Sequence, residues 1–158
     1  MKFNRFSFPL IMVASLFLIF LAGSCKKEKE VPGNWVRFSL INKGEKTNWL
    51  GNDVSVQFQL GKMVLKGTND DGSSLQLATD EAIVGTYLVE DDKALGVLNL
   101  GTGNDPLKIF AADSGSVTIT TADLNTKLIQ GTFELWFVNP ATQEEAKAFG
   151  SFRSNINL

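Results

Sequence analysis

The sequence predicts an all-β protein, an antiparallel β-sandwich of about nine or ten strands. Three observations predict it. Apolar and polar residues alternate in many short runs, turn residues interrupt these runs roughly every eight to twelve residues, and no amphipathic run is long enough for a secure helix. The only segment considered as a helix is 79–83. A closed barrel is the alternative architecture, since barrels are built from strands of the same kind.

The first half of the chain holds the clearest alternation. In "DVSVQFQL", residues 53–60, every second side chain is apolar, as a half-buried strand requires. Two further runs, in "KMVLKGTNDDGSSLQLA", flank the turn Asn69 to Gly72, which is a hairpin signature. Short apolar runs bounded by Gly, Asp or Pro follow in "GTYLVE", "LGVLNLG" and "PLKIFAAD", and each predicts one strand.

The second half predicts a long hairpin and a last strand. The segments "GSVTITTAD" and "LIQGTFELWFVN" face each other across the turn Asp123 to Thr126. The tail "AKAFGSFRSNINL" supplies the final strand. A domain of this size can bury a core of its own, so neither a metal nor a disulfide is needed to stabilise it.

The composition of the chain excludes several classes of function. The 158 residues carry 15 basic and 17 acidic side chains, a formal charge of -2, so the chain lacks the basic footprint of a protein that binds nucleic acid. The absence of His removes the usual general base and the commonest metal ligand, and the single Cys excludes a disulfide framework. No metal or cofactor is expected, and catalysis would have to depend on carboxylates, Lys or Tyr.

Residues 1–24 have the three-part layout of a secretory signal. Lys2 and Arg5 precede an apolar run over 6–21, and the small residues 22–24 end it. A retained membrane span is the alternative, because the run and its flanks approach the length that crosses a bilayer. Pro9 and the small-residue end argue against a span.

Cys25 favours a secretory signal over a retained membrane span. The sequence Ala22-Gly23-Ser24-Cys25 resembles the bacterial lipobox, in which cleavage precedes the Cys and its thiol receives a diacylglycerol group. The resemblance implies a lipoprotein held by several acyl chains, since a single chain gives only marginal attachment. Ala22 stands where Leu is more common, and Leu21 lies one position further back, a departure tolerated in lipoproteins of Bacteroidota.

We therefore expect a signal peptide over 1–24, a lipidated Cys25 with a flexible tether over 25–34, and one β-sandwich domain over 35–158. The tether sequence "KKEKE" alternates Lys and Glu, so it only partly resembles the acidic stretches that act as surface-export signals in Bacteroidota. The expected location is the bacterial outer membrane, either on the cell surface or on the periplasmic face.

The last third of the chain has a distinctive pattern: a Gly with alternating Thr and Ile, a Gly-Thr-Phe with aromatic alternation, and a late Gly-x-Phe. The residues are Gly115, 117–120, 131–133, Gly150 and Phe152, with Trp49 and 85–87 as earlier counterparts. In this pattern most of the predicted mature chain resembles an uncharacterised family of small Bacteroidota lipoproteins, classed as a domain of unknown function. The resemblance implies an all-β lipoprotein without an assigned activity.

A second resemblance is to lipocalins. Gly33-x-Trp35 is their opening motif, in which the Trp packs at the closed end of the barrel under an Arg from a late strand. Arg153 is the candidate for that Arg. This resemblance implies a lipocalin-like β-barrel that carries an apolar ligand.

Trp136 and Glu134 are the candidate ligand-binding residues. In "GTFELWFVN", Phe133, Leu135 and Phe137 share one face, so Trp136 and Glu134 lie on the other. An exposed aromatic on a sheet can stack on a sugar or a partner. The interpretation that the sequence favours is nevertheless that a loop or a neighbouring strand covers Trp136.

Trp49 and Trp35 are the other two tryptophans of the chain. Trp49 follows a charged turn and is a further candidate for ligand contact, although we expect it to close one end of the sandwich. Trp35 is expected to anchor the first strand.

The acidic clusters admit functional interpretations that the sequence does not favour. Asn69, Asp70 and Asp71 offer oxygens to calcium, but turn chemistry explains the same residues. The segments 90–92 and 144–145 hold two or more carboxylates each, which a glycoside hydrolase would need across a cleft. Both segments are hydrophilic connections, where solvated charges are usual.

The expected function is that of a lipid-anchored envelope protein, not an enzyme, that acts as a binding or structural accessory module. Its expected partners are the membrane, through the lipid on Cys25, and a glycan or an envelope protein. A lipocalin-like carrier is the first alternative, and a carboxylate-dependent glycoside hydrolase is the second.

Overall fold

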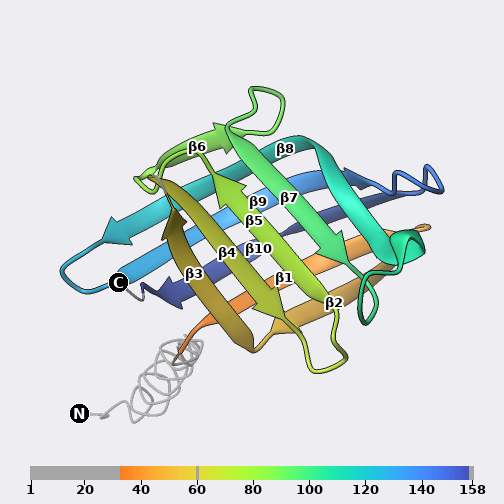
Figure 1. Cartoon of the computed structure of the whole chain (residues 1–158), viewed down its shortest axis with the longest axis horizontal. Coiled ribbons are helices and arrows are strands. Elements are labelled where there is room, and N and C mark those ends of the chain that lie inside the picture. The colour runs from red at the N-terminus through yellow and green to blue at the C-terminus, as the bar shows by residue number, and fades with distance from the viewer. Residues whose placement is uncertain (1–32, 60, 157–158) are drawn as a thin grey trace, which may run out of the picture. The chain divides into compact units, whose positions relative to one another are not determined.

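The computed structural model describes residues 33–59 and 61–156, in which the chain forms ten strands and a turn of 3-10 helix (Figure 1). The all-β prediction is confirmed, and no helix in these ranges is long and apolar enough to cross a membrane. The elements are β1 (Trp35–Asn42), β2 (Glu45–Gly51), β3 (Asp53–Gln59), β4 (Lys62–Thr68), β5 (Ser74–Thr79), β6 (Gly85–Leu88), β7 (Ala94–Asn99), η1 (Pro106–Lys108), β8 (Ile109–Asp123), β9 (Leu128–Val138) and β10 (Glu145–Asn155).

The strands form one antiparallel sheet in the order β2-β1-β10-β9-β8-β7-β5-β4-β3, with β6 paired to β8 outside this path. The two ends of the sheet, β2 and β3, follow each other in the chain, so the sheet is a meander nearly closed into a barrel. Figure 1 shows β3, β4, β5 and β7 as one layer that crosses a second layer of β8, β9, β10, β1 and β2. The fold thus has the two facing layers of a sandwich and the strand order of a barrel.

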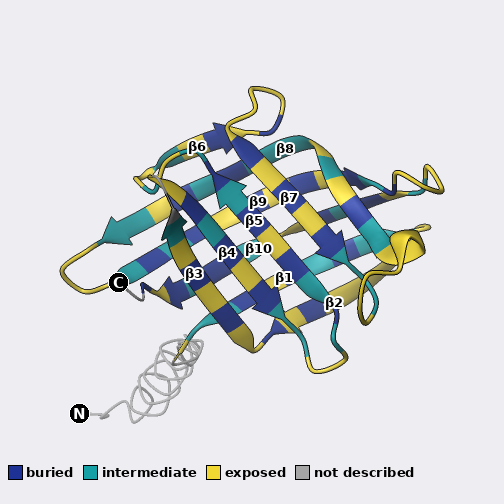
Figure 2. Ribbon diagram, in the orientation of Figure 1, coloured by how far each residue is buried: buried dark blue, intermediate teal, exposed yellow. Residues whose placement is uncertain are grey.

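Side chains from both layers fill the space between them. Buried and exposed residues alternate along most strands, as Figure 2 shows, because successive side chains of a strand point to opposite faces. Complete burial of one large apolar side chain contributes about 1.5–3 kcal/mol. The largest fully buried side chains include Phe110, Phe137, Phe152, Met63 and Leu65.

Trp49 packs in this core and holds the corner between β2 and β3. Its ring stacks on Phe38, with centroids 4.7 Å apart, and Phe38 meets Phe133 edge-on at 5.7 Å. The Trp49 indole N–H donates to the Ser73 hydroxyl at 2.7 Å, which ties β2 to the turn between β4 and β5. Trp49 is only 7% exposed, so its ring is part of the core.

Asn34 bridges the open seam of the sheet at one end. Its side-chain amide donates to the Val54 carbonyl of β3 at 3.2 Å, and its side-chain oxygen accepts from the Asn155 N–H of β10 at 2.8 Å. One residue just before β1 therefore links two strands that make no ladder with each other. These bonds help to close the barrel without a continuous ladder between β2 and β3.

The prediction of a helix over 79–83 is wrong, because the structure has none there. Thr79 ends β5, its hydroxyl donates to the Glu81 carbonyl at 2.6 Å, and the Asp80 N–H donates to the Lys93 carbonyl at 2.9 Å. These bonds hold the segment as an irregular connection between β5 and β6.

The two strands predicted over 106–113 and 115–123 are a single strand, β8, preceded by η1. Gly115 has a φ of 113°, and the pairing with β9 shifts register between Ala112 and Ser114. Such a bulge bends a strand without ending it. The bend lets one end of β8 pair with β7 and the other pair with β6.

Candidate functional site

Trp136 lies on the outer face of β9 and is 43% exposed. Phe133, Leu135 and Phe137 point into the core, as the alternation predicted. The favoured interpretation that a loop or a strand covers Trp136 is therefore wrong. The reason is that the other layer, formed by β3, β4, β5 and β7, packs only against the inner face of β9, so the outer face of this strand stays open to solvent.

Three neighbours complete a surface around Trp136. Lys147 of β10 is its partner in the ladder, and Phe149 is the ladder partner of Glu134, so all four side chains point outward together. The Lys147 ammonium lies 4.2 Å from the centre of the Trp136 ring and 2.6 Å from a Glu134 carboxylate oxygen. It also lies 5.9 Å from the centre of the Phe149 ring. We call Trp136, Glu134, Lys147 and Phe149 the Trp136 platform.

A hollow of about 340 Å³ borders this platform. Its size falls within the range of about 300–1,000 Å³ that is usual for small-molecule sites. Trp136 and Lys147 line it from the platform, and Asp113, Ser114, Lys43 and Glu145 surround them with polar groups. The hollow therefore combines one aromatic ring with hydrogen-bond donors and acceptors.

The bulge in β8 positions Asp113 and Ser114, which line the hollow on its polar side. Asp113 lies inside the irregular pairing between Ala112 and Ser114, where a strand can redirect its side chains. Gly115 follows, and a Cβ at this position would collide with the Glu134 carbonyl oxygen. Glycine is thus needed for β8 to pass closely over β9 beside the Trp136 platform.

The sequence identified Trp136 and Glu134 but missed Lys147 and Phe149. A signal was present, because Ala146 and Ala148 are small apolar residues that alternate with them. The alternation predicts that Lys147 and Phe149 share the outer face. Their place opposite Trp136 and Glu134 depends on the register between two strands, which the pattern along one strand does not give.

Trp49 does not join this site. It lies inside the core, stacked on Phe38, whereas the Trp136 platform is on the outer face of the sheet. The predicted lipid attachment at Cys25 lies outside the residues that the structure describes, as do the signal segment and most of the tether.

Trp35 is not packed as the lipocalin resemblance implies. It faces outward at the start of β1, and the guanidinium carbon of Arg37 lies 4.7 Å from the centre of its ring. Arg153 is the ladder partner of Trp35, but the cation over the ring belongs to Arg37 of the same strand. The alternation that buries Val36 and Phe38 turns Trp35 and Arg37 away from the core.

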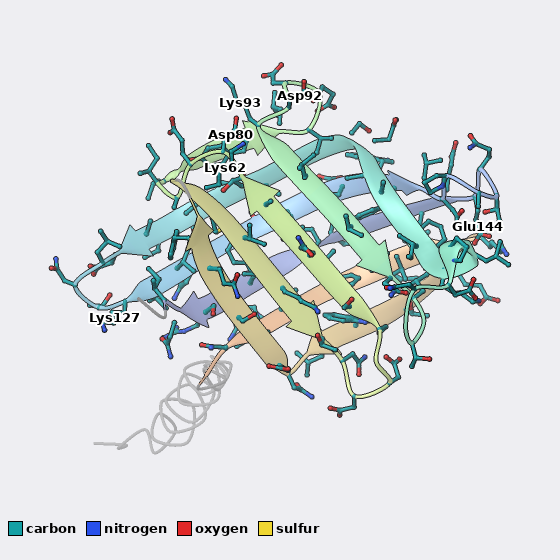
Figure 3. All side chains as sticks on the ribbon, viewed as in Figure 1. Lys62, Asp80, Asp92, Lys93, Lys127 and Glu144 are labelled. Atoms are coloured by element: carbon teal, nitrogen blue, oxygen red, sulfur yellow. The ribbon has the colours of Figure 1, made fainter. Side chains whose placement is uncertain are left out.

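The acidic clusters of the sequence lie in separate places. Figure 3 shows Asp92 at the top edge of the domain and Glu144 at its right end, and Glu144 forms an ion pair with Lys43 at 3.0 Å. The hydrogen bond from Lys43 lowers the pKa of Glu144. In the turn between β4 and β5, hydrogen bonds from Ser73 lower the pKa of Asp71. A general acid in glycoside hydrolysis needs a raised pKa, which is the opposite direction.

The turn 69–72 is held by its own hydrogen bonds. The Ser73 N–H donates to an Asp71 carboxylate oxygen at 2.8 Å, and the Gly72 N–H donates to the Asn69 carbonyl at 3.0 Å. Within the described ranges, no group of three or more Cys, Asp or Glu side chains is arranged to hold a metal ion. Turn chemistry accounts for this sequence, because Asn and Asp bond to the backbone two residues on.

Comparison with known proteins identifies a family but no activity. No curated protein and no solved structure matches the chain. The family model described as a domain of unknown function, DUF6252, matches residues 40–154, which include the whole Trp136 platform and the β8 bulge. The chain therefore belongs to the DUF6252 family.

Proposed function

We propose that this protein is a lipid-anchored module of the bacterial envelope that binds a saccharide on the Trp136 platform and does no chemistry on it. The observation that carries the proposal is a Trp that is 43% exposed beside a hollow of about 340 Å³ with polar walls. A sugar ring has an apolar C–H face and a rim of hydroxyls, so it matches an aromatic ring surrounded by hydrogen-bond partners.

The electrostatics support a binding role over hydrolysis. A retaining or inverting glycosidase needs two carboxyl groups across the scissile bond, one of them with a raised pKa. Hydrogen bonds lower the pKa values of Asp71, Asp123 and Glu144, so these three carboxyl groups are not suited to act as the general acid. The lack of His also removes the usual proton-transfer group from the whole chain.

The packing of the core also favours binding on the outside over a lipocalin-like carrier. Phe38 contacts both Trp49 and Phe133 in the core, where a carrier would hold its apolar ligand. The outer face instead offers an aromatic ring that is already exposed to solvent.

Replacing Trp136 by Ala tests the binding role. Titration of the purified protein with a panel of soluble oligosaccharides should find a ligand whose affinity falls by about tenfold or more in this variant, because stacking on the ring is lost. Leu95→Ala is the matched control, since Leu95 is also exposed but lies on the other layer. Equal binding by the Trp136→Ala variant, or no saccharide bound at all, would contradict the proposal.

Cys25 supplies the proposed anchor. Cys25→Ser should abolish labelling by a radioactive fatty acid and release the protein from membranes, because several acyl chains are needed for lasting attachment. Labelling that persists in the variant would exclude the anchor. Protease treatment of intact cells, with a known periplasmic lipoprotein as control, then distinguishes the cell surface from the periplasmic face.

A further inference from the structure

The Trp136 platform already holds an ammonium group. The Lys147 Nζ atom lies 2.6 Å from Glu134 Oε1 and 4.2 Å from the centre of the Trp136 ring, and the Phe149 ring is 5.9 Å away. A carboxylate on one side and an aromatic face on another are the two elements that recognise organic cations. Glu134 and the Trp136 ring therefore offer a positively charged amine both a carboxylate and an aromatic face.

Lys147 occupies this position without being locked into it. The side chains of Lys147 and Glu134 are 32% and 52% exposed, so solvent weakens their ion pair. Loss of an exposed ion pair or an exposed cation–π contact changes an equilibrium by only about two- to fivefold each. The flexible Lys147 side chain can rotate away at low cost when another cation offers the same contacts.

We infer, on the basis of the proposed function, that the saccharide bound here is an amino sugar with a free, protonated amine. Its ammonium group takes the place of the Lys147 Nζ atom next to Glu134, and its ring lies over Trp136. Hydroxyls of the sugar reach Asp113 and Ser114 in the adjoining hollow. Lys147 is thus an internal stand-in for the ligand, and it leaves the site when the ligand binds.

Two sets of oligosaccharides test this inference. Oligomers of glucosamine and of N-acetylglucosamine of equal length differ only at the C2 nitrogen, where acetylation replaces the charged amine by a neutral amide with a methyl group. Isothermal titration of the purified protein should show about two- to fivefold tighter binding of the glucosamine oligomer, because only its amine can pair with Glu134 and the displacement of Lys147 offsets part of the gain. Glu134→Gln should remove this preference while the acetylated oligomer binds as before.

Lys147→Met tests the stand-in role, because Met keeps an unbranched apolar side chain and removes the competing ammonium. Binding of the glucosamine oligomer should become about three- to tenfold tighter, with little change for the acetylated oligomer. Lys62→Met is the matched control and should change neither affinity. Lys62 pairs with Asp80 at 2.8 Å at the edge of the other layer, where Figure 3 labels both residues.

The outcomes separate the inference from the proposed function. Equal affinity for the two oligomers, lost in Trp136→Ala, would overturn the amino-sugar inference and leave saccharide binding intact. Weaker binding of the glucosamine oligomer by Lys147→Met would overturn the stand-in role, because Lys147 would then contact the sugar directly. Failure of every saccharide to bind would overturn both the proposed function and the inference that rests on it.

Discussion

Replacement of Trp49 by Phe and of Ser73 by Ala, singly and together, tests how the corner of the sheet is held. The Trp49 indole N–H donates to the Ser73 hydroxyl at 2.7 Å, and the two residues are only 7% and 4% exposed. Ser73 in turn bonds the Asp71 carboxylate. This relay links β2 to the turn between β4 and β5, close to the seam where the sheet stays open.

The three variants have different expected costs. Ser73→Ala leaves the indole N–H without its acceptor inside the core, which should lower the free energy of unfolding by about 1–3 kcal/mol. Trp49→Phe keeps an aromatic ring against Phe38 and loses one hydrogen bond, which costs about 0.5–1.5 kcal/mol, plus on the order of 1 kcal/mol of burial. In the double variant no indole N–H remains to be left unpaired. Its cost should therefore be about 1 kcal/mol below the sum of the single costs.

Urea unfolding followed by far-UV circular dichroism measures these energies without depending on Trp fluorescence. Trp136→Phe is the control, because this ring is exposed and its change should stay within about 0.5 kcal/mol. The m-values must stay equal for the comparison to hold, since a changed slope would indicate a changed unfolded state. If the cost of the double variant equals the sum of the two single costs within about 0.3 kcal/mol, the claim that this hydrogen bond holds the corner is refuted.

Two further predictions follow from the same contacts. The pKa of Asp71 is lowered by its bonds from Ser73, so its stabilisation is present above the ordinary Asp value near pH 4 and is lost as the pH falls through and below that value. Asp71→Asn should therefore flatten the acid dependence of the urea midpoint, and an unchanged slope would contradict the assignment. Gly150→Ala should lower the free energy of unfolding by about 1–3 kcal/mol or more, because its Cβ would collide with the Arg37 carbonyl. Ser151→Ala is the neighbouring control, and equal urea midpoints for the two variants would show that the strands can separate there.

Local alternation predicted most of the fold because a strand with one buried face must repeat every second residue. The hairpin turns 69–72 and 123–126 were predicted for the same local reason, since their side chains bond their own backbone. The continuity of β8 was not predictable in this way. Gly115 looks like a strand boundary in the sequence, but its role is to let β8 pass close to β9, a contact with a distant part of the chain.

The exposure of Trp136 was not predictable from its own strand. The pattern in β9 gives two faces and shows which one is more apolar, but it does not show what covers the other face. That depends on the strand order, which leaves the outer side of β8, β9 and β10 without a further layer among the described residues. An isolated outward Trp in a strand is thus ambiguous until the neighbours of that strand are known.

The loop between β9 and β10 fixes the geometry of the Trp136 platform. Asn139 is fully buried, and its side-chain oxygen accepts from the Ala141 and Thr142 N–H groups at 2.8 and 3.0 Å. Its side-chain amide donates to the Pro106 carbonyl at 3.2 Å, which ties the loop to η1. A one-residue slip of β10 against β9, caused by an insertion or a deletion in this loop, would turn Lys147 toward the core and away from Trp136. The geometry of the ammonium site on the outer face therefore also depends on Asn139, a buried side chain that is not itself part of the Trp136 platform.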